Sequence, residues 1–134
     1  MIVRLLELPT EDLRPLLQEG KAEGFRFLER LQDDWASGEN RFNHEGEAIF
    51  GYYVDSRLVA VGGINRQSTS RGRLRRFFVS RDFRRRGIGR ALVAEILAHA
   101  MLYFDDVVLH TETTNGSPGR SPAPVNWYPG RVGA

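Results

Sequence analysis

Apolar residues near the start of the chain recur first at the spacing of a strand and then at that of two helices. Residues 2–8 alternate loosely and end at Pro9, which predicts a first strand. Thr10 is the expected N-cap of a first helix, because two acidic residues and leucines at helical spacing follow it, and Gly20 fits its end. Apolar residues three to four apart predict a second helix over residues 25–35.

The middle of the chain predicts three strands, a long helix and one further strand. Residues 48–54 and 58–64 are rich in β-branched and aromatic residues on either side of a short polar turn, which is typical of a hairpin. Residues 74–79 predict the next strand. Residues 87–104 are mostly apolar and rich in alanine and leucine, as expected of a helix packed on a sheet, and residues 107–113 predict another strand.

The resulting β-α-α-β-β-β-α-β order predicts an α/β (α+β) fold. A mixed, mostly antiparallel central sheet should be flanked by helices, with one right-handed β-α-β unit. We expect residues 1–115 to form one domain. Residues 116–134 contain four glycines and four prolines without a helical stripe, so we expect an irregular segment with at most a short strand around residues 124–128. No C-terminal helix or hairpin is predicted there.

The composition is that of a globular protein without disulfides. The chain has 134 residues, 41% of them hydrophobic and 27% charged, which fits one domain with a core of its own. The absence of cysteine excludes a disulfide scaffold, a thiolate metal site and a cysteine nucleophile. No apolar run approaches the ~20 residues of a membrane-spanning helix. Acidic residues follow too soon after Met1 for a secretory signal, so we expect a cytoplasmic protein without a membrane partner.

Basic residues are concentrated in one segment of the chain. Between Arg71 and Arg90 there are nine arginines and one acid, a net charge of +8, whereas the rest of the chain carries −6. Lys21 is the only lysine. A basic segment on an acidic body predicts a localised polyanionic partner rather than a uniformly adhesive surface.

The basic segment contains a strand, a short loop and a helix that begins with glycines. Arg84-Arg85-Arg86-Gly87-Ile88-Gly89 opens the helix directly after the strand. The N-terminus of a helix leaves backbone N–H groups without partners, and glycines let a ligand approach them closely, so this geometry suits a phosphate or pyrophosphate. Neither a Walker A loop nor a dinucleotide-binding fingerprint fits, because no Lys-Ser or Lys-Thr follows the glycines and the third glycine of G-x-G-x-x-G is missing.

These residues resemble the acetyl-CoA signature of the GNAT N-acetyltransferase superfamily. R-x-x-G-x-G falls at Arg84, Gly87 and Gly89, preceded by the strand 77–79 and followed by Arg90-Ala91-Leu92. Asn115 follows the last predicted strand, where the family often keeps an asparagine near the cofactor. The resemblance covers residues 2–115, and the segment DWASGENRF is similar to that of bacterial stand-alone members.

The resemblance implies that acetyl-CoA is the co-substrate. The implied cofactor-binding residues are Phe77, Phe78, Val79, Arg84, Arg85, Arg86, Gly87, Ile88, Gly89, Arg90, Ala91 and Asn115. Backbone groups of residues 77–79 would pair with the pantetheine arm, and amides of residues 85–91 would hold the pyrophosphate, supplemented by the arginines. An amine would then attack the thioester directly, with a backbone N–H near Val79 stabilising the oxyanion.

The end of the chain departs from the family's pattern. After Asn115 the family usually runs A-x-x-x-Y-x-x-x-G-F, and its tyrosine protonates the CoA thiolate. Here Tyr128 is the remaining tyrosine candidate for that role, and it stands outside any helical pattern. His110 and Glu112 share one face of the last predicted strand, either as a general base or as ordinary exposed strand residues.

Other expectations concern the acceptor, metals and assembly. Trp35, Asn40, Arg41 and Phe42 are candidates for lining an amine pocket, with a core role as the alternative for Trp35. No histidine has metal-ligand spacing, so no metal is expected. An unpaired sheet edge at the irregular C-terminus would favour a homodimer.

Three functions remain open from the sequence. The first is an acetyl-CoA-dependent N-acetyltransferase that acts on a small-molecule or peptide amine. The second is a non-catalytic acyl-CoA-binding or regulatory module, which the missing tyrosine motif favours. The third is a small nucleic-acid-binding domain that uses the arginines between Arg71 and Arg90.

Overall fold

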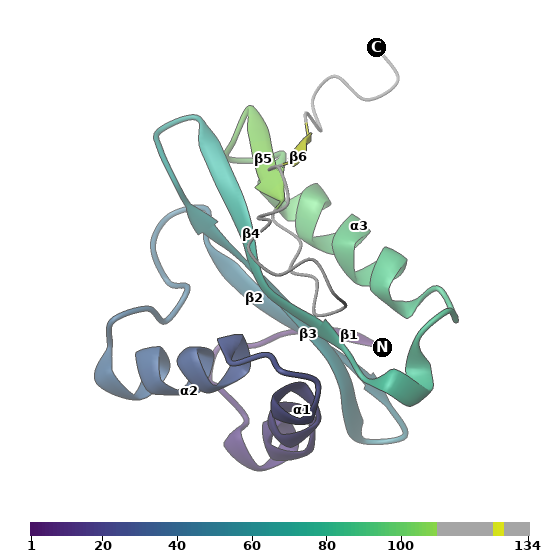
Figure 1. Ribbon diagram of the computed structural model, residues 1–134. Helices are drawn as coiled ribbons and strands as arrows, with labels where there is room; N and C mark the ends of the chain where they lie inside the picture. The colour runs from purple at the N-terminus through teal and green to yellow at the C-terminus, as the bar shows by residue number, and fades with distance from the viewer. Residues whose placement is uncertain (110–124, 128–134) are drawn as a thin grey trace.

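The computed structural model describes residues 1–109 and 125–127, which form one six-stranded sheet with helices on both faces (Figure 1). The strands lie in the order β1-β2-β3-β4-β5-β6. The elements are β1 (Ile2–Arg4), α1 (Thr10–Ala22), α2 (Phe27–Ser37), β2 (Ala48–Val54), β3 (Arg57–Arg66), β4 (Arg71–Val79), a 3-10 turn (Arg81–Phe83), α3 (Ile88–Ala100), β5 (Asp106–Leu109) and β6 (Val125–Trp127).

The pairing of the strands is mostly antiparallel. Strands β1 to β4 form an antiparallel run, β5 pairs with β4 in parallel, and β6 pairs antiparallel with β5. Helix α3 connects β4 to β5, since a parallel pair needs a crossover. The predicted mixed, mostly antiparallel α/β fold is therefore confirmed.

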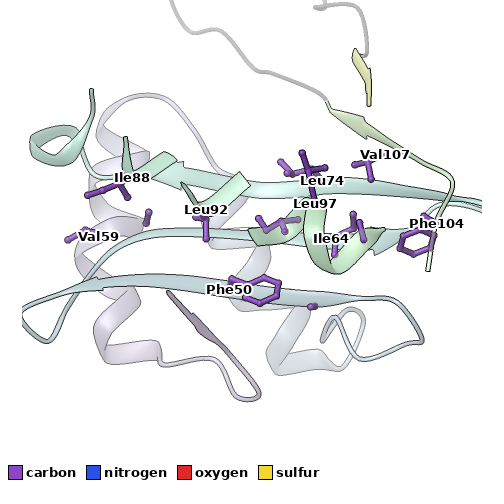
Figure 2. Packing of buried hydrophobic residues seen from close by; sticks show 13 residues of the cluster. Phe50, Val59, Ile64, Leu74, Ile88, Leu92, Leu97, Phe104 and Val107 are labelled. Atoms are coloured by element: carbon purple, nitrogen blue, oxygen red, sulfur yellow. The ribbon is translucent and has the colours of Figure 1, made fainter. Parts of the chain in front are cut away.

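Two apolar clusters hold the helices to the sheet. On one face, Leu92 and Ile96 of α3 are fully buried against Val59 and Ile64 of β3, and Figure 2 shows the surrounding side chains. On the other face, α1 and α2 bury leucines against β2, β3 and β4; the buried residues of this second cluster are Leu5, Leu13, Leu16, Leu28, Leu31, Phe42, Ile49, Leu58, Val61 and Phe78. Each such side chain contributes about 1.5–3 kcal/mol of transfer free energy.

A β-bulge interrupts β4. Val61 pairs with Phe78 and Gly63 with Arg75, so two residues of β4 lie opposite Gly62. Arg76 takes up the extra residue with a left-handed φ of 58°. The extra residue shifts the alternation of side chains in the second half of β4. As a result, Phe77 packs on the cluster beneath α3 and Phe78 on the cluster beneath α1 and α2.

Several predicted boundaries of the first two helices are wrong. Pro9, not Thr10, occupies the N-cap of α1, and no side chain caps the helix. Gly20 does not end α1, which continues to Ala22, because Gly20 is buried against Leu28 and Phe78 and offers its carbonyl to the next loop. Helix α2 begins at Phe27 rather than residue 25, and Gly38 ends it in a left-handed conformation.

The ends of other elements also differ from the prediction. Helix α3 stops at Ala100 instead of residue 104, because the chain turns there to bury Phe104 against Gly46 and Gly72. Strand β1 ends at Arg4, and the chain bends at residues 6 and 7, where Leu6 is 79% exposed.

The last strands complete the sheet. Strand β5 is described to Leu109, and predicted strand residues 110–113 lie outside the described residues. The short strand expected around residues 124–128 is present as β6. Strand β6 pairs with β5 and is itself the last strand of the described sheet, so the sheet ends within the C-terminal segment.

Candidate functional site

One edge of β4 is free over its second half. Strand β5 pairs with β4 from Arg71 to Leu74, whereas residues 75–79 pair with β3 alone in the described part of the chain. The amide of Ser80 donates to Val59 O on β3 at 2.7 Å. Because amide directions alternate along a strand, the N–H groups of Phe77 and Val79 point away from β3, toward the free edge. No described strand pairs with this edge of residues 75–79.

The loop after β4 is held in place by α1. The Glu19 carboxylate accepts from Ser80 Oγ at 3.0 Å and from the Arg81 amide. Arg84 Nε donates to Val79 O at 2.9 Å, and its Nη2 donates to Glu23 Oε1 at 2.7 Å. These charge-assisted bonds fix the direction in which the chain leaves the sheet.

The chain then enters α3 through two left-handed residues, Arg85 (φ 64°) and Gly87 (φ 80°). Gly87 is the N-cap, and the first helical bond runs from the Ala91 amide to Gly87 O at 3.0 Å. The amides of the first turn therefore lack partners within the helix. A Cβ on Gly87 would meet nothing within 4 Å, so this position requires glycine for its φ and not for lack of space.

Gly89 lies over the side chains of Phe77 and Val79 at the end of β4. A Cβ built there would lie 3.4 Å from Val79 Cγ2 and 3.5 Å from Phe77 Cζ, which is ordinary contact. The amides of the first turn of α3, which lack partners within the helix, therefore lie close to residues 77–79 of β4, whose outward amides face the free edge. Positive charge surrounds this point, since Arg85, Arg86 and Arg90 are exposed.

These three arginines differ from Arg84 in their partners. Among the described residues, no carboxylate lies within ion-pair distance of Arg85, Arg86 or Arg90. The Arg86 guanidinium lies over the Phe83 ring, 5.3 Å from its centroid. The predicted segment 84–90 therefore divides into one arginine that is bonded to the fold and three that face solvent.

The predicted acceptor residues do not gather at this edge. Phe42 is 3% exposed, with its ring packed on Gly63. Asn40 exchanges two side-chain hydrogen bonds with Asn65, at 2.9 and 3.0 Å, and so holds its loop to β3. Arg41 donates from Nε to Trp35 O at 2.8 Å.

Trp35 and Arg41 line a separate cavity of about 440 Å³. Its other lining residues are Leu6, Glu7, Leu8, Ala36 and Asn43, so it lies between the β1–α1 loop and the end of α2. No residue of β4 lines it.

The remaining candidates cannot be placed. His110, Glu112, Asn115 and Tyr128 lie outside the described residues. Within residues 1–109 and 125–127, no three His, Asp or Glu side chains come together in a way that could hold a metal ion. In the same part of the chain, no helix has the length and apolarity to cross a bilayer.

A group of arginines on the other face of β4 was missed. The sequence treats Arg73, Arg75 and Arg76 only as members of the basic segment, but the structure places them near Arg30 and Asp34 of α2. Strand alternation was the available signal, because Arg73 and Arg75 flank Leu74, whose side chain packs toward α3.

Comparison with known families settles the assignment that the glycine loop suggested. The model of the acetyltransferase (GNAT) family matches residues 4–117. The chain belongs to the GNAT family of acetyltransferases. The resemblance predicted from Arg84, Gly87 and Gly89 is thereby confirmed.

Solved GNAT structures share the fold. A structure from Exiguobacterium sp. 255-15, assigned as an acetyltransferase, is 26% identical with a TM-score of 0.78 and covers 94% of this chain and 92% of its own. The ribosomal-protein-S18-alanine N-acetyltransferase of Escherichia coli is 19% identical, with a TM-score of 0.61 and coverage of 87% and 71%. A GNAT acetyltransferase from Elizabethkingia anophelis with acetyl-CoA bound is 15% identical, with a TM-score of 0.57 and coverage of 89% and 68%. No curated protein sequence matches the chain.

Proposed function

We propose that this GNAT protein transfers the acetyl group of acetyl-CoA to a primary amine. The observation that carries the proposal is the meeting of two sets of unpartnered amides. Those of Phe77 and Val79 face the free edge of β4, and those of the first turn of α3 begin beside it at Gly89. An extended thioester carrier with a diphosphate at one end is complementary to this pair of surfaces.

The diphosphate binds at the start of α3. The amides of residues 85–91 donate to its oxygens, and the helix dipole favours its negative charge. The exposed guanidinium groups of Arg85, Arg86 and Arg90 neutralise the rest of the negative charge of the diphosphate. Arg84 acts mainly through the loop, because its Nε is bonded to Val79 O and its Nη2 to Glu23.

The pantetheine arm extends the sheet along β4. It takes the place of the missing neighbour of residues 75–79 and bonds to the outward amide and carbonyl groups. The thioester oxygen then accepts a hydrogen bond from an outward amide, with Phe77 N–H the nearest to the bulge. Asn115 follows β5 and completes the carrier site.

The acceptor must reach the thioester as a neutral amine, since an alkylammonium has a pKa near ~10.4. Its nitrogen forms a bond to the carbonyl carbon, the carbon–sulfur bond breaks, and the thiolate leaves with the electron pair. A proton passes from the nitrogen to a base, for which we propose Glu112 or His110, and another reaches the sulfur, for which we propose Tyr128. Trp35 and Arg41 remain candidates for acceptor contacts. Asn40 and Phe42 support the loop that contains Arg41. A homodimer and a cytoplasmic location stay predictions.

Two assays test the proposal in order. Acetyl-CoA and CoA should raise the melting temperature, and a duplex oligonucleotide should not. Thiol release from acetyl-CoA should then depend on an added amine. Tyr128→Phe should lower kcat and change KM much less. Cofactor binding without amine-dependent thiol release would indicate a regulatory module. A thermal shift with the oligonucleotide alone would contradict acetyl-CoA binding.

A further inference from the structure

Four arginines cluster on the face of β4 that is opposite α3. Arg73, Arg75 and Arg76 come from β4 and Arg30 comes from α2, which lies on that face of the sheet (Figure 1). Asp34 of α2 lies among them. Four guanidinium groups and one carboxylate give the cluster a net charge of +3.

The cluster has donors without acceptors. Arg76 has a side chain that is 7% exposed, and its Nη2 lies 3.4 Å from Asp34 Oδ2, but its Nε is buried and has no hydrogen-bond partner in residues 1–109. The Nε of Arg73 is likewise buried and unpartnered. Burial is the main cause that lowers the pKa of the Arg75 guanidinium, and the charges of Arg76 and Arg73 lower it further.

Stability of the fold does not account for this arrangement. Like charges in a partly desolvated space repel one another, and a buried donor without an acceptor costs free energy. The same strand also contains an arginine that is fully paired. Arg71 bonds in a bidentate manner to Asp106, with Nε–Oδ1 at 2.8 Å and Nη2–Oδ2 at 2.9 Å. No described residue offers Arg73 or Arg75 a carboxylate in this way.

The cluster lies beside the proposed reaction centre. Arg76 is adjacent in the chain to Phe77, whose amide faces the free edge. In the proposed binding mode the carrier's diphosphate end lies at α3, on one face of the sheet. An acceptor that approaches the thioester from the other face would come along the side where these guanidinium groups lie.

We propose that the acceptor amine carries an oxyanion, a carboxylate or a phosphate, which binds between Arg75, Arg73 and Arg30. The inference rests on the proposed acetyl transfer and names its substrate class. Guanidinium groups bind either oxyanion through paired N–H donors. An amine that has no oxyanion approaches as a cation and is repelled. Once the oxyanion is bound, the remaining positive field lowers the pKa of the ammonium and favours the neutral nucleophile.

Matched acceptor pairs test the proposal. Alanine is compared with alaninamide, and 2-aminoethyl phosphate with 2-aminoethanol, in the wild type, Arg75→Gln and Arg14→Gln. Arg14 is exposed on α1, so its variant removes the same charge elsewhere. In at least one pair the oxyanion-bearing member should have a kcat/KM about tenfold higher, a factor typical of a charge-assisted contact. The pair that shows the preference identifies carboxylate or phosphate.

Arg75→Gln should remove most of this preference, Arg75→Lys should retain part of it, and Arg14→Gln should leave it unchanged. Equal rates within both pairs, or a preference that survives Arg75→Gln combined with Arg73→Gln, would overturn the proposal. Calorimetry of the same four compounds with the CoA-loaded protein supplies a readout without turnover. Oxyanion binding that Arg75→Gln abolishes supports the inference even if acetyl transfer fails, and absent or variant-independent binding overturns it while leaving acetyl-CoA binding intact.

Discussion

Arg84 Nε lies 2.9 Å from the carbonyl oxygen of Val79, so the arginine that opens the glycine loop is bonded to the strand end that carries the free edge. The same guanidinium bonds to Glu23 and lies over the ring of Phe78, 5.3 Å from its centroid. One side chain thereby sets the distance between the two sets of free amides. We therefore propose that the first arginine of R-x-x-G-x-G is a positioning residue in this protein.

Replacing Arg84 by glutamine should therefore weaken acetyl-CoA binding through the loop. We expect the Kd to rise about tenfold and the free energy of unfolding to fall by about 1 kcal/mol, as for loss of a charge-assisted bond at a partly exposed site. Glu23→Gln is the matched control, since it removes the ion pair but leaves the bond to Val79. An unchanged Kd in Arg84→Gln, measured by calorimetry, would show that the loop does not need this bond.

Substitution of Gly87 should cost stability through backbone strain alone. Its φ of 80° is unfavourable for a residue with a Cβ, and a Cβ there would have open space. Gly87→Ala is expected to lower the free energy of unfolding by about 1–2 kcal/mol. Gly87→Asn should lower it less, because asparagine tolerates the left-handed region. Urea unfolding measures both, and equal losses would argue against strain as the cause.

His99 should make the fold sensitive to mild acid. Burial is the main cause that lowers its pKa below 6.5, and the charge of Arg4 lowers it further, against an opposing hydrogen bond to the backbone of Gly46. Below pH 6.5 the unfolded chain binds a proton more readily than the folded one, so stability falls as the pH falls from 6.5 toward the folded pKa.

The variant His99→Phe isolates that effect. Its ring can keep the contacts with Phe50 and Tyr103, and Nε2 has no hydrogen-bond partner within the described residues. The variant also removes the bond to Gly46, whose loss should lower stability at every pH by a similar amount. We expect the variant to lose less stability than the wild type between pH 7.5 and 5.5, measured by urea unfolding at each pH. Parallel losses in the two proteins would assign the acid sensitivity to other groups.

The fold and the strand–loop–helix unit of residues 74–91 are the parts that the sequence predicts well, because their signals are local. Residues 74–91 contain a strand, a glycine loop and the start of a helix. This local order alone predicts a row of free amides, without knowledge of any tertiary contact. Boundaries that depend on tertiary packing were predicted wrongly. Helix α3 ends where Phe104 turns into the core, and Gly20 stays helical because it fits beneath Phe78.

The arginines show most clearly what a sequence leaves undetermined. The sequence alone does not distinguish the nine arginines between Arg71 and Arg90, but the fold gives them different environments. Arg71 is paired with Asp106, Arg84 is bonded to the end of β4, and Arg75 on the α2 face has no ion pair with a described carboxylate. The register of β4, with its bulge at Arg76, sets the environments of Arg71 and Arg75, and the loop after β4 sets that of Arg84.

Calorimetric titration of acetyl-CoA into the wild type and Gly89→Leu tests the central claim most directly. A Cβ at Gly89 has ordinary contacts with the side chains of Val79 and Phe77, so the variant should fold, while the larger side chain should occupy space beside the first turn of α3. We predict one acetyl-CoA per wild-type chain and an affinity at least about tenfold weaker in the variant, a difference of about 1.4 kcal/mol in binding free energy. No heat of binding in the wild type, or equal affinity in a folded Gly89→Leu, would contradict the placement of acetyl-CoA between β4 and α3.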